Sequence, residues 1–352
     1  MLTKNINLKS FELKTQTKKV LRSLKNLLKD QPKFFDTLKP LYKYNYSKKI
    51  LTKYKKMSNI RIIGIGGSVL GAEAIYEFLK SKITQNITFV NSLNSNADYF
   101  QDKKINLNLI ISKSGNTLET IVNSNVLIKR RDKNIIITEN SNNYLLNYAK
   151  KLKADIIEHK NYVGGRYSVL SEVGMLPAEL MNLNESNFKQ FNNLIKNKVF
   201  INKLINNVST TLNLIKRGKH NSIILNYDDR SENLFKWYQQ LVAESLGKKS
   251  KGIIPIISSM PKDNHSLMQL YLDGPKKSFY TFFNVLDNNL VKINNNNILN
   301  SHKYLRNKSI EKIKQSQILA TEKVFKSNKI PFRSFKILKR DERSLGELFC
   351  FF

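Results

Sequence analysis

Short apolar segments alternate with helical patterns along most of this chain, and that alternation constrains the fold more than any other feature. The segments predicted as buried strands are 59–67, 87–91, 107–111, 134–138, 222–226, 253–257, 279–285 and 332–338. They are nearly continuous apolar runs, which is typical of parallel strands covered on both faces. Helical patterns lie at 72–82, 117–130, 143–152, 232–246 and 309–328. The pattern predicts an α/β protein with doubly wound parallel sheets.

The alternation occurs twice, with a linker predicted roughly from residue 178 to residue 200. A chain of 352 residues is long enough for two domains of ordinary size. We expect an N-terminal helical segment over 1–56, a first domain over 57–190 and a second domain over 200–352. The N-terminal segment is lysine-rich with apolar residues at helical spacing, which predicts one or two amphipathic helices.

The formal charge of +33 is typical of proteins that bind nucleic acid. Lysines are spread along the whole chain together with many asparagines and isoleucines, so a biased residue usage explains the charge better than a localised patch. No nucleic-acid-binding motif accompanies the charge. We therefore expect no nucleic-acid partner, although a basic surface could attract an anionic substrate.

Residue content also bears on the compartment and on metal binding. No apolar run approaches the roughly 20 residues of a membrane span, and the N-terminus lacks the apolar core of a signal peptide. The single cysteine, Cys350, excludes an intramolecular disulfide framework. The histidines lie far apart, at positions 159, 220, 265 and 302. These features predict a cytoplasmic protein with no membrane association and no metal site.

The segment 109–120 joins a predicted strand to a predicted helix through a loop of serines, threonines, an asparagine and one lysine. Free backbone N–H groups and the positive end of the helix dipole favour an anion at such a loop. Helix capping explains one or two of these side chains. It does not explain a dense cluster with an interleaved lysine, so we predict a phosphate-binding loop.

A glycine-rich turn, Gly64-Ile65-Gly66-Gly67-Ser68, lies between the first predicted strand and the next helix. Glycines allow close approach of a ligand to the backbone. A dinucleotide fingerprint would need glycine where Val69 stands and an acidic residue where Asn91 stands. A tight turn without a ligand is the alternative, and the presence of a second loop of similar topology favours a sugar or phosphate site.

Three further motifs could carry chemistry. Arg166 follows Gly164-Gly165 and could meet a developing oxyanion, although a surface arginine in a turn explains the tripeptide alone better. Glu244 lies on the helical face that carries Trp237. A partly apolar setting would raise the pKa of this carboxylate and suit a general base. An ordinary glutamate at a helix end is the simpler interpretation. His265, at a predicted loop-to-helix junction, could shuttle protons or be incidental to a helix start.

Taken together and in this order, the segments resemble the glucose-6-phosphate isomerase (phosphoglucose isomerase) family. The matching motifs are Gly-Ile-Gly-Gly-Ser, Ser-Lys-Ser-x-x-Thr, Gly-Gly-Arg-Tyr-Ser, Gln-x-x-x-Glu-Ser-x-Gly-Lys, the loop with His265, and Leu-Gly-Glu-Leu after Ser344. The resemblance covers about residues 59–352. It implies two sugar-isomerase (SIS) domains, a homodimer, a sugar-phosphate substrate and no cofactor.

The resemblance also implies residue roles. The residues implied to bind the substrate are Ser112, Ser114 and Thr117 with Lys113 nearby for the 6-phosphate, and Gly67, Ser68 and Gln240 for the sugar. Glu244 would move the proton between C2 and C1 through a cis-enediol intermediate. Arg166 would stabilise the enediolate charge, and His265 of a neighbouring subunit would assist ring opening.

The resemblance stops at the C-terminus. The family continues past the Leu-Gly-Glu-Leu helix to an Asp-Gln-Pro segment and an active-site lysine, whereas this sequence ends at Phe352, in an apolar run for which Ser344 is the expected helix N-cap. We therefore expect a second domain that is C-terminally truncated relative to the family. Two alternatives to the isomerase stay open: an isomerase that also accepts mannose 6-phosphate, which Gln240 disfavours, and a non-catalytic sugar-phosphate-binding protein.

Overall fold

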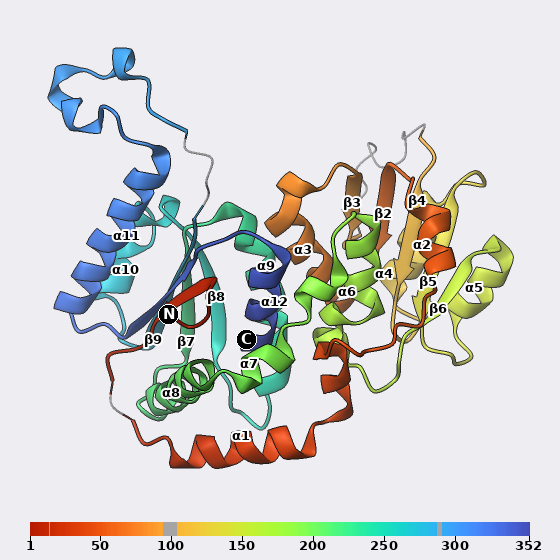
Figure 1. The fold of residues 1–352 in the computed structure, drawn as a ribbon, viewed down its shortest axis with the longest axis horizontal. Helices are drawn as coiled ribbons and strands as arrows, with labels where there is room; N and C mark the ends of the chain where they lie inside the picture. The colour runs from red at the N-terminus through yellow and green to blue at the C-terminus, as the bar shows by residue number, and fades with distance from the viewer. Residues whose placement is uncertain (14, 94–103, 287–290) are drawn as a thin grey trace. The chain divides into compact units, whose positions relative to one another are not determined.

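The computed structural model describes residues 1–13, 15–93, 104–286 and 291–352. The chain divides into two compact units, each assembled from segments far apart in sequence (Figure 1). The first unit comprises 1–29, 195–232 and 245–344, and the second unit comprises 30–194, 233–244 and 345–352.

The second unit is built on a five-stranded parallel sheet with the order β3-β2-β4-β5-β6. Its strands are β2 (Asn59–Ile63), β3 (Asn86–Val90), β4 (Leu107–Ile111), β5 (Lys133–Thr138) and β6 (Asp155–Glu158). The helices wholly within it are α2 (Lys48–Tyr54), α3 (Leu70–Leu79), α4 (Leu118–Leu127), α5 (Tyr144–Leu152) and α6 (Glu172–Leu180). Every residue of β4 is buried, as expected for a central strand covered on both faces.

The strand order of this sheet reverses next to β2. The chain passes from β2 to β3 on one side, returns to β4 on the other side, and then continues to β5 and β6. In open parallel sheets ligands bind beyond the carboxyl ends of the strands at such a switch point. The loops after β2 and β4 therefore flank the expected ligand crevice.

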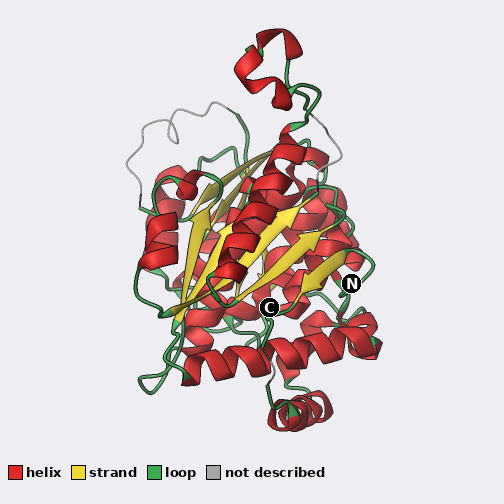
Figure 2. Cartoon of the chain, turned by 90° about the vertical axis from the view of Figure 1, so that its left-hand side faces the viewer, coloured by secondary structure: helices red, strands yellow, loops and turns green. Residues whose placement is uncertain are grey.

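The first unit holds the second sheet, with the order β1-β10-β9-β7-β8. Strands β7 (Asn221–Asn226), β8 (Ile254–Ser259), β9 (Ser278–Val285) and β10 (Phe332–Ile337) are parallel, and β1 (Ile6–Lys9) pairs antiparallel with β10. The strands are yellow and the helices red in Figure 2. Phe325 and other apolar side chains pack on Tyr280 and Phe282 of β9 in one core cluster.

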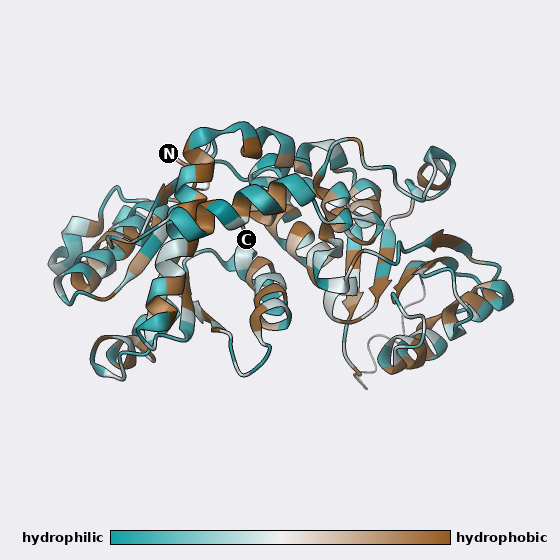
Figure 3. Cartoon of the chain, turned by 90° about the horizontal axis from the view of Figure 1, so that it is seen from below, coloured by the Kyte–Doolittle hydropathy of each residue, from teal (hydrophilic) through white to brown (hydrophobic). Residues whose placement is uncertain are grey.

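The remaining helices are α1 (Lys18–Asp30), α7 (Phe191–Lys196), α8 (Lys198–Lys216), α9 (Glu232–Leu246), α10 (Met268–Asp273), α11 (Ile310–Ser327) and α12 (Glu342–Phe351). Residues 233–244 of α9 and 345–351 of α12 belong to the second unit. The helices carry both hydrophilic and hydrophobic positions (Figure 3), as helices with one packed face do. Within the described ranges, no helix combines the length and apolar content needed to cross a bilayer.

The expected α/β fold with two largely parallel sheets is confirmed, and eight predicted strands lie within a few residues of their expected positions. Strand β1 was not predicted, because it lies in a segment expected to be helical. It is a four-residue edge strand whose side chains alternate between buried and exposed, too short a pattern to recognise. Helix α6 was also not predicted, because Gly174 and Pro177 inside it argue against a helix.

Two further predictions need correction. The segment expected as a linker up to about residue 200 contains α7 and the start of the 19-residue helix α8. Helix α12 begins at Glu342, so Ser344 is not its N-cap. The Asp341 carboxylate accepts the Ser344 backbone N–H at 2.8 Å and takes the capping role instead.

Candidate functional site

The loop after β4 folds into a tight turn at the start of α4. Gly115 has a φ of +67°, which favours glycine. The hydroxyls of Ser112 and Thr117 lie 2.8 Å apart, and the Gly115 N–H donates to Ser112 Oγ at 3.1 Å. Thr117 is the N-cap residue of α4 but its side chain makes no capping hydrogen bond. Its hydroxyl therefore faces Ser112, and capping does not account for it.

Two side chains of this loop are held by neighbouring loops. Lys113 Nζ donates to the Asn161 carbonyl at 2.8 Å and lies 3.4 Å from the Glu139 carboxylate. Asn116 Oδ1 accepts the Tyr144 N–H at 2.9 Å. Ser114 is exposed, and its Oγ accepts the Asn116 N–H. Ser114 and Thr117 are thus the more accessible hydroxyls of this loop, Ser112 is buried behind them, and Lys113 would meet an anion only in competition with its present partners.

The glycine-rich turn after β2 is pressed against two other segments of the second unit. A Cβ on Gly64 would lie 2.7 Å from the Ile111 carbonyl oxygen at the end of β4. A Cβ on Gly67 would lie 2.3 Å from the Gly165 carbonyl group and 2.9 Å from the Arg166 nitrogen. These two glycines thus make room for the protein's own backbone, and Ser68 beside them is half-buried.

The arginine turn and helix α9 meet through an ion pair. Arg166 belongs to the 3-10 helix η5 (Gly165–Leu170), and its Nη1 donates to Glu244 Oε2 at 3.2 Å. Gln240 Nε2 donates to the other carboxylate oxygen at 2.7 Å. Burial lowers the pKa of Arg166, but hydrogen bonds with Tyr167 and Glu244 outweigh it and raise the pKa above its ordinary value. Both oxygens of Glu244 therefore face donors.

Gln240 also reaches the glycine-rich turn. A Cβ on Gly66 would lie 3.0 Å from Gln240 Nε2, and Gly66 has a φ of +55°. The buried Gln240 Oε1 has no hydrogen-bond partner in the part of the chain that the structure describes. Buried acceptors are normally paired, so this oxygen lacks the partner that most buried acceptors have.

One expectation for Glu244 is wrong. A partly apolar setting for this carboxylate was one of two interpretations, suggested by Trp237 on the same helical face. The Glu244 side chain is 46% exposed, whereas Trp237 is buried and packs edge-on against Phe349 at 4.9 Å. The apolar face of the helix packs on the core, whereas the Glu244 carboxylate is partly exposed to solvent.

His265 belongs to the first unit. It lies between the 3-10 helix η8 (Lys262–Asn264) and α10, as the predicted loop-to-helix junction requires, and its side chain is exposed. Asp263 orders this loop by accepting hydrogen bonds from Ser258 Oγ and the Ser259 N–H, both at 2.8 Å. Ser266 Oγ donates to the same carboxylate.

The second unit thus brings together the glycine-rich turn, the arginine turn and the Gln240–Glu244 face, beside the hydroxyl-rich loop. No cluster of three or more histidine, cysteine, aspartate or glutamate side chains suited to a metal occurs among the described residues. Sequence reasoning missed Ser168, whose buried hydroxyl contacts the carbonyls of Gly67 and Gly165. Its only sequence signal is its place at the end of the Gly-Gly-Arg-Tyr-Ser motif.

Comparisons with known proteins cover most of the chain. The family described as phosphoglucose isomerase matches residues 3–345. A glucose-6-phosphate isomerase of Methanocaldococcus jannaschii is 36% identical over 256 residues, which are 66% of this chain and 62% of that protein. A probable glucose-6-phosphate isomerase of Methanococcus maripaludis is 30% identical over 334 residues, 86% of this chain and 73% of the relative. The solved structure of a glucose-6-phosphate isomerase from Chlamydia trachomatis shares the fold, with a TM-score of 0.66 at 18% identity, covering 86% of this chain and 65% of that one.

Proposed function

The chain belongs to the phosphoglucose isomerase family, and from this premise we propose that it interconverts glucose 6-phosphate and fructose 6-phosphate as an aldose–ketose isomerase. One observation carries the proposal furthest. A carboxylate and a guanidinium, Glu244 and Arg166, meet at 3.2 Å beside a glutamine with an unpaired buried oxygen. A proton transfer through an enediol needs a base to accept the proton and a nearby positive charge to stabilise the enediolate.

The hydroxyl-rich loop supports a role in binding the 6-phosphate. Ser112 and Thr117 present adjacent hydroxyls at the start of α4, where the helix dipole favours negative charge. Gly67, Ser68 and Gln240 are proposed to contact the sugar, with Gln240 Oε1 accepting from a sugar hydroxyl. Lys113 is proposed to assist phosphate binding by exchanging its present partners for the anion.

In the proposed isomerisation Glu244 accepts the proton from C2 of the open-chain aldose. The electron pair of the broken C2–H bond forms the C1–C2 double bond of a cis-enediolate, while the π pair of the C1 carbonyl moves onto O1. A proton then passes from O2 to O1, the C2 carbonyl forms, and the same carboxylate returns its proton to C1, which gives the ketose. Arg166 stabilises the negative charge that develops on the enediolate oxygens. Substrate would enter between Arg166 and Glu244, replacing their direct hydrogen bond.

Ring opening is proposed to use His265. An exposed imidazole near neutral pH can pass a proton to the ring oxygen. We propose that a homodimer forms and that the histidine acts on the site of the partner copy, as the resemblance to the family implies.

The test is turnover of glucose 6-phosphate, with mannose 6-phosphate and binding without turnover as the competing outcomes. Glu244→Gln should lower kcat by at least about 100-fold, because the amide cannot accept the proton. Glu12→Gln is a matched control, since Glu12 forms an exposed ion pair at the same 3.2 Å with Lys326. Full activity of Glu244→Gln contradicts the mechanism. Comparable rates on mannose 6-phosphate would favour the bifunctional enzyme, and sugar-phosphate binding without turnover would favour the non-catalytic protein.

A further inference from the structure

A buried hydroxyl joins the two loops on which the sugar end of the proposed site is built. Ser168 lies in η5 and is fully buried. Its Oγ is 3.0 Å from the Gly67 carbonyl oxygen and 2.7 Å from the Gly165 carbonyl oxygen. Ser168 and Gly67 are 101 residues apart in the chain, so this contact is a long-range connection and not part of a local turn.

The contact matters because the Gly67 turn and the Gly165 turn are packed closely against each other. The Gly67 Cα lies 4.0 Å from the place where a Cβ on Gly165 would stand, and a Cβ on Gly67 would overlap the Gly165 carbonyl. Two carbonyl oxygens are therefore brought near each other in a buried place. One hydroxyl proton can be shared between two acceptors and offset their repulsion. Without it the Gly67 oxygen would lose this donor while buried and the Gly165 oxygen while partly buried, which costs free energy unless the loops move apart or admit water.

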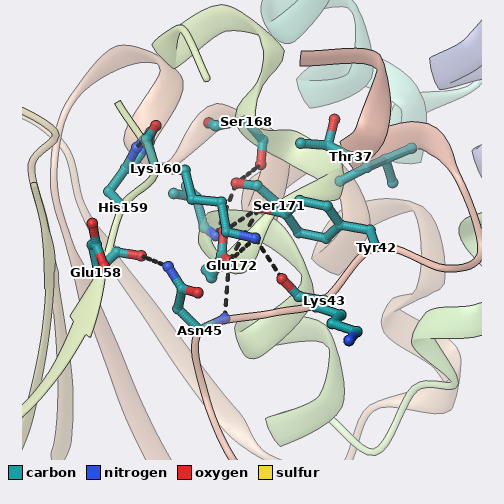
Figure 4. Close-up of polar contacts among 12 residues, drawn as sticks. Thr37, Tyr42, Lys43, Asn45, Glu158, His159, Lys160, Ser168, Ser171 and Glu172 are labelled. Atoms are coloured by element: carbon teal, nitrogen blue, oxygen red, sulfur yellow. Dashed lines mark hydrogen bonds and ion pairs between the residues drawn. The ribbon is translucent and has the colours of Figure 1, made fainter. Parts of the chain in front are cut away.

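Ser168 is itself held in place by a buried network (Figure 4). Its carbonyl accepts from Ser171 Oγ at 2.7 Å and from the Ser171 N–H at 2.9 Å. The next residue, Glu172, is buried and accepts from the Tyr42 hydroxyl at 2.9 Å and from the Asn45 N–H at 3.0 Å. Lys160 Nζ lies 3.9 Å from the same carboxylate. These contacts anchor the Ser168 backbone through Ser171 and hold the adjacent Glu172 in place.

We propose that Ser168 is a positioning residue that sets the distance between the sugar-contacting turn, Gly64–Ser68, and the guanidinium of Arg166. The inference rests on the proposed function. Arg166 stands two residues before Ser168 on the same short helix, so a shift of η5 relative to Gly67 moves Arg166 relative to the bound sugar. Since Arg166 is proposed to act on the enediolate, the shift should affect the transition state more than the bound substrate.

The first test compares two buried serines. Ser168→Ala should lower kcat about 10- to 100-fold and change KM less than about twofold, because small misplacements weaken transition-state contacts while phosphate binding persists. Ser124→Ala is the matched control. Ser124 is equally buried, but its Oγ donates to the Thr120 carbonyl at 2.6 Å within its own helix. The control should lower the melting temperature without lowering kcat, and an equal loss of kcat in both variants would overturn the proposal.

The second test does not need turnover. Calorimetric titration uses inorganic phosphate and 5-phosphoarabinonate, a sugar acid whose carboxylate places negative charge where the enediolate would carry it. Ser168→Ala should weaken binding of the sugar acid about tenfold and leave phosphate binding unchanged. Equal weakening of both ligands would assign Ser168 a purely structural role. A wild-type chain that binds both ligands but converts no sugar phosphate would refute the proposed function, and the comparison of the two ligands would still decide the role of Ser168. A wild-type chain that binds neither ligand would refute both the proposed function and the positioning role.

Discussion

Arg166 donates to the Glu244 carboxylate at 3.2 Å, although 78 residues separate the two in the chain. The arginine comes from a short 3-10 helix after β6 and the glutamate from the last turn of α9. The pair is partly open to solvent, with side-chain exposures of 23% and 46%. Solvent-accessible pairs of this kind contribute about 0–1 kcal/mol to stability. Their arrangement therefore bears more on chemistry than on folding.

Arg166→Lys keeps the charge but loses the planar fork of donors. We expect kcat to fall about 10-fold in this variant and about 100- to 1,000-fold in Arg166→Ala, because each removes donors aimed at developing negative charge. Steady-state kinetics in both directions provide the measurement. Arg217→Lys, an exposed change on the first unit that leaves the Arg166 turn untouched, should retain wild-type kcat. Unchanged kcat in Arg166→Ala would remove this arginine from the mechanism.

Gly67 and Gly165 touch, yet they should tolerate alanine very differently. A Cβ on Gly67 would meet the Gly165 carbonyl at 2.3 Å, whereas a Cβ on Gly165 would find its nearest atom, the Gly67 Cα, at 4.0 Å. Gly67→Ala should destabilise the chain by roughly 1–3 kcal/mol and lower kcat, since the clash displaces the Arg166 turn. Gly165→Ala should change the unfolding free energy by less than about 0.5 kcal/mol. Urea unfolding of the two variants tests this asymmetry, and equal losses would contradict the packing described.

The candidate site residues that belong to local sequence motifs could be predicted from the sequence. The contacts that depend on how backbone segments pack against one another could not. Hydroxyls around Ser112 and the arginine after two glycines are visible in the sequence because the proposed chemistry lies in the side chains themselves. The partners of Ser168 are carbonyl oxygens, which every residue has, so no pattern marks this contact. The exposure of Glu244 depends on how far Trp237 turns into the core, which helical spacing does not fix.

Tertiary packing also limited how much of the fold could be predicted from the sequence. Eight strands of the parallel sheets were predicted because burial on both faces leaves continuous apolar runs. The edge strand β6 (Asp155–Glu158) was missed, because only one of its four residues is buried. Helix α6 was missed because its Pro177 and Gly174 are tolerated only when tertiary packing outweighs propensity, and the helix is almost wholly buried. The burial of Lys189 was also not predictable. In a chain so rich in lysine, nothing in the sequence distinguishes a buried lysine from an exposed lysine.

Thr117→Val removes one hydroxyl of the proposed phosphate loop and keeps the β-branched shape. We expect KM for the sugar phosphate and the inhibition constant of inorganic phosphate to rise together, about 10- to 100-fold, because a hydrogen bond to a charged group is worth about 1.5–3 kcal/mol. The value of kcat should stay within about threefold. Thr52→Val, on exposed helix α2, is the control and should change neither constant. A loss of kcat at unchanged KM would mean that this loop does not hold the phosphate.

Lys189 is buried among aromatic rings and carbonyl groups, and it should make stability depend on pH. Its Nζ donates to the Thr37 carbonyl at 2.6 Å and lies 4.9 Å from the Tyr44 ring. Burial lowers the pKa of Lys189 to about 7, although nearby carboxylates oppose the shift. Between pH 7 and about 10 the unfolded chain keeps this proton while the folded chain has lost it, so raising the pH in this window favours folding.

We therefore expect the unfolding free energy of the wild type to rise with pH, relative to Lys189→Met, by up to about 1.4 kcal/mol per pH unit between pH 7 and pH 9. The methionine variant lacks the titrating group but retains a side chain of similar length. Urea unfolding at half-unit pH steps gives both curves, and Lys198→Met, at an exposed position, should follow the wild type. Parallel curves for the wild type and Lys189→Met would show that the buried ammonium keeps its proton, with the Thr37 carbonyl and the neighbouring carboxylates outweighing its desolvation.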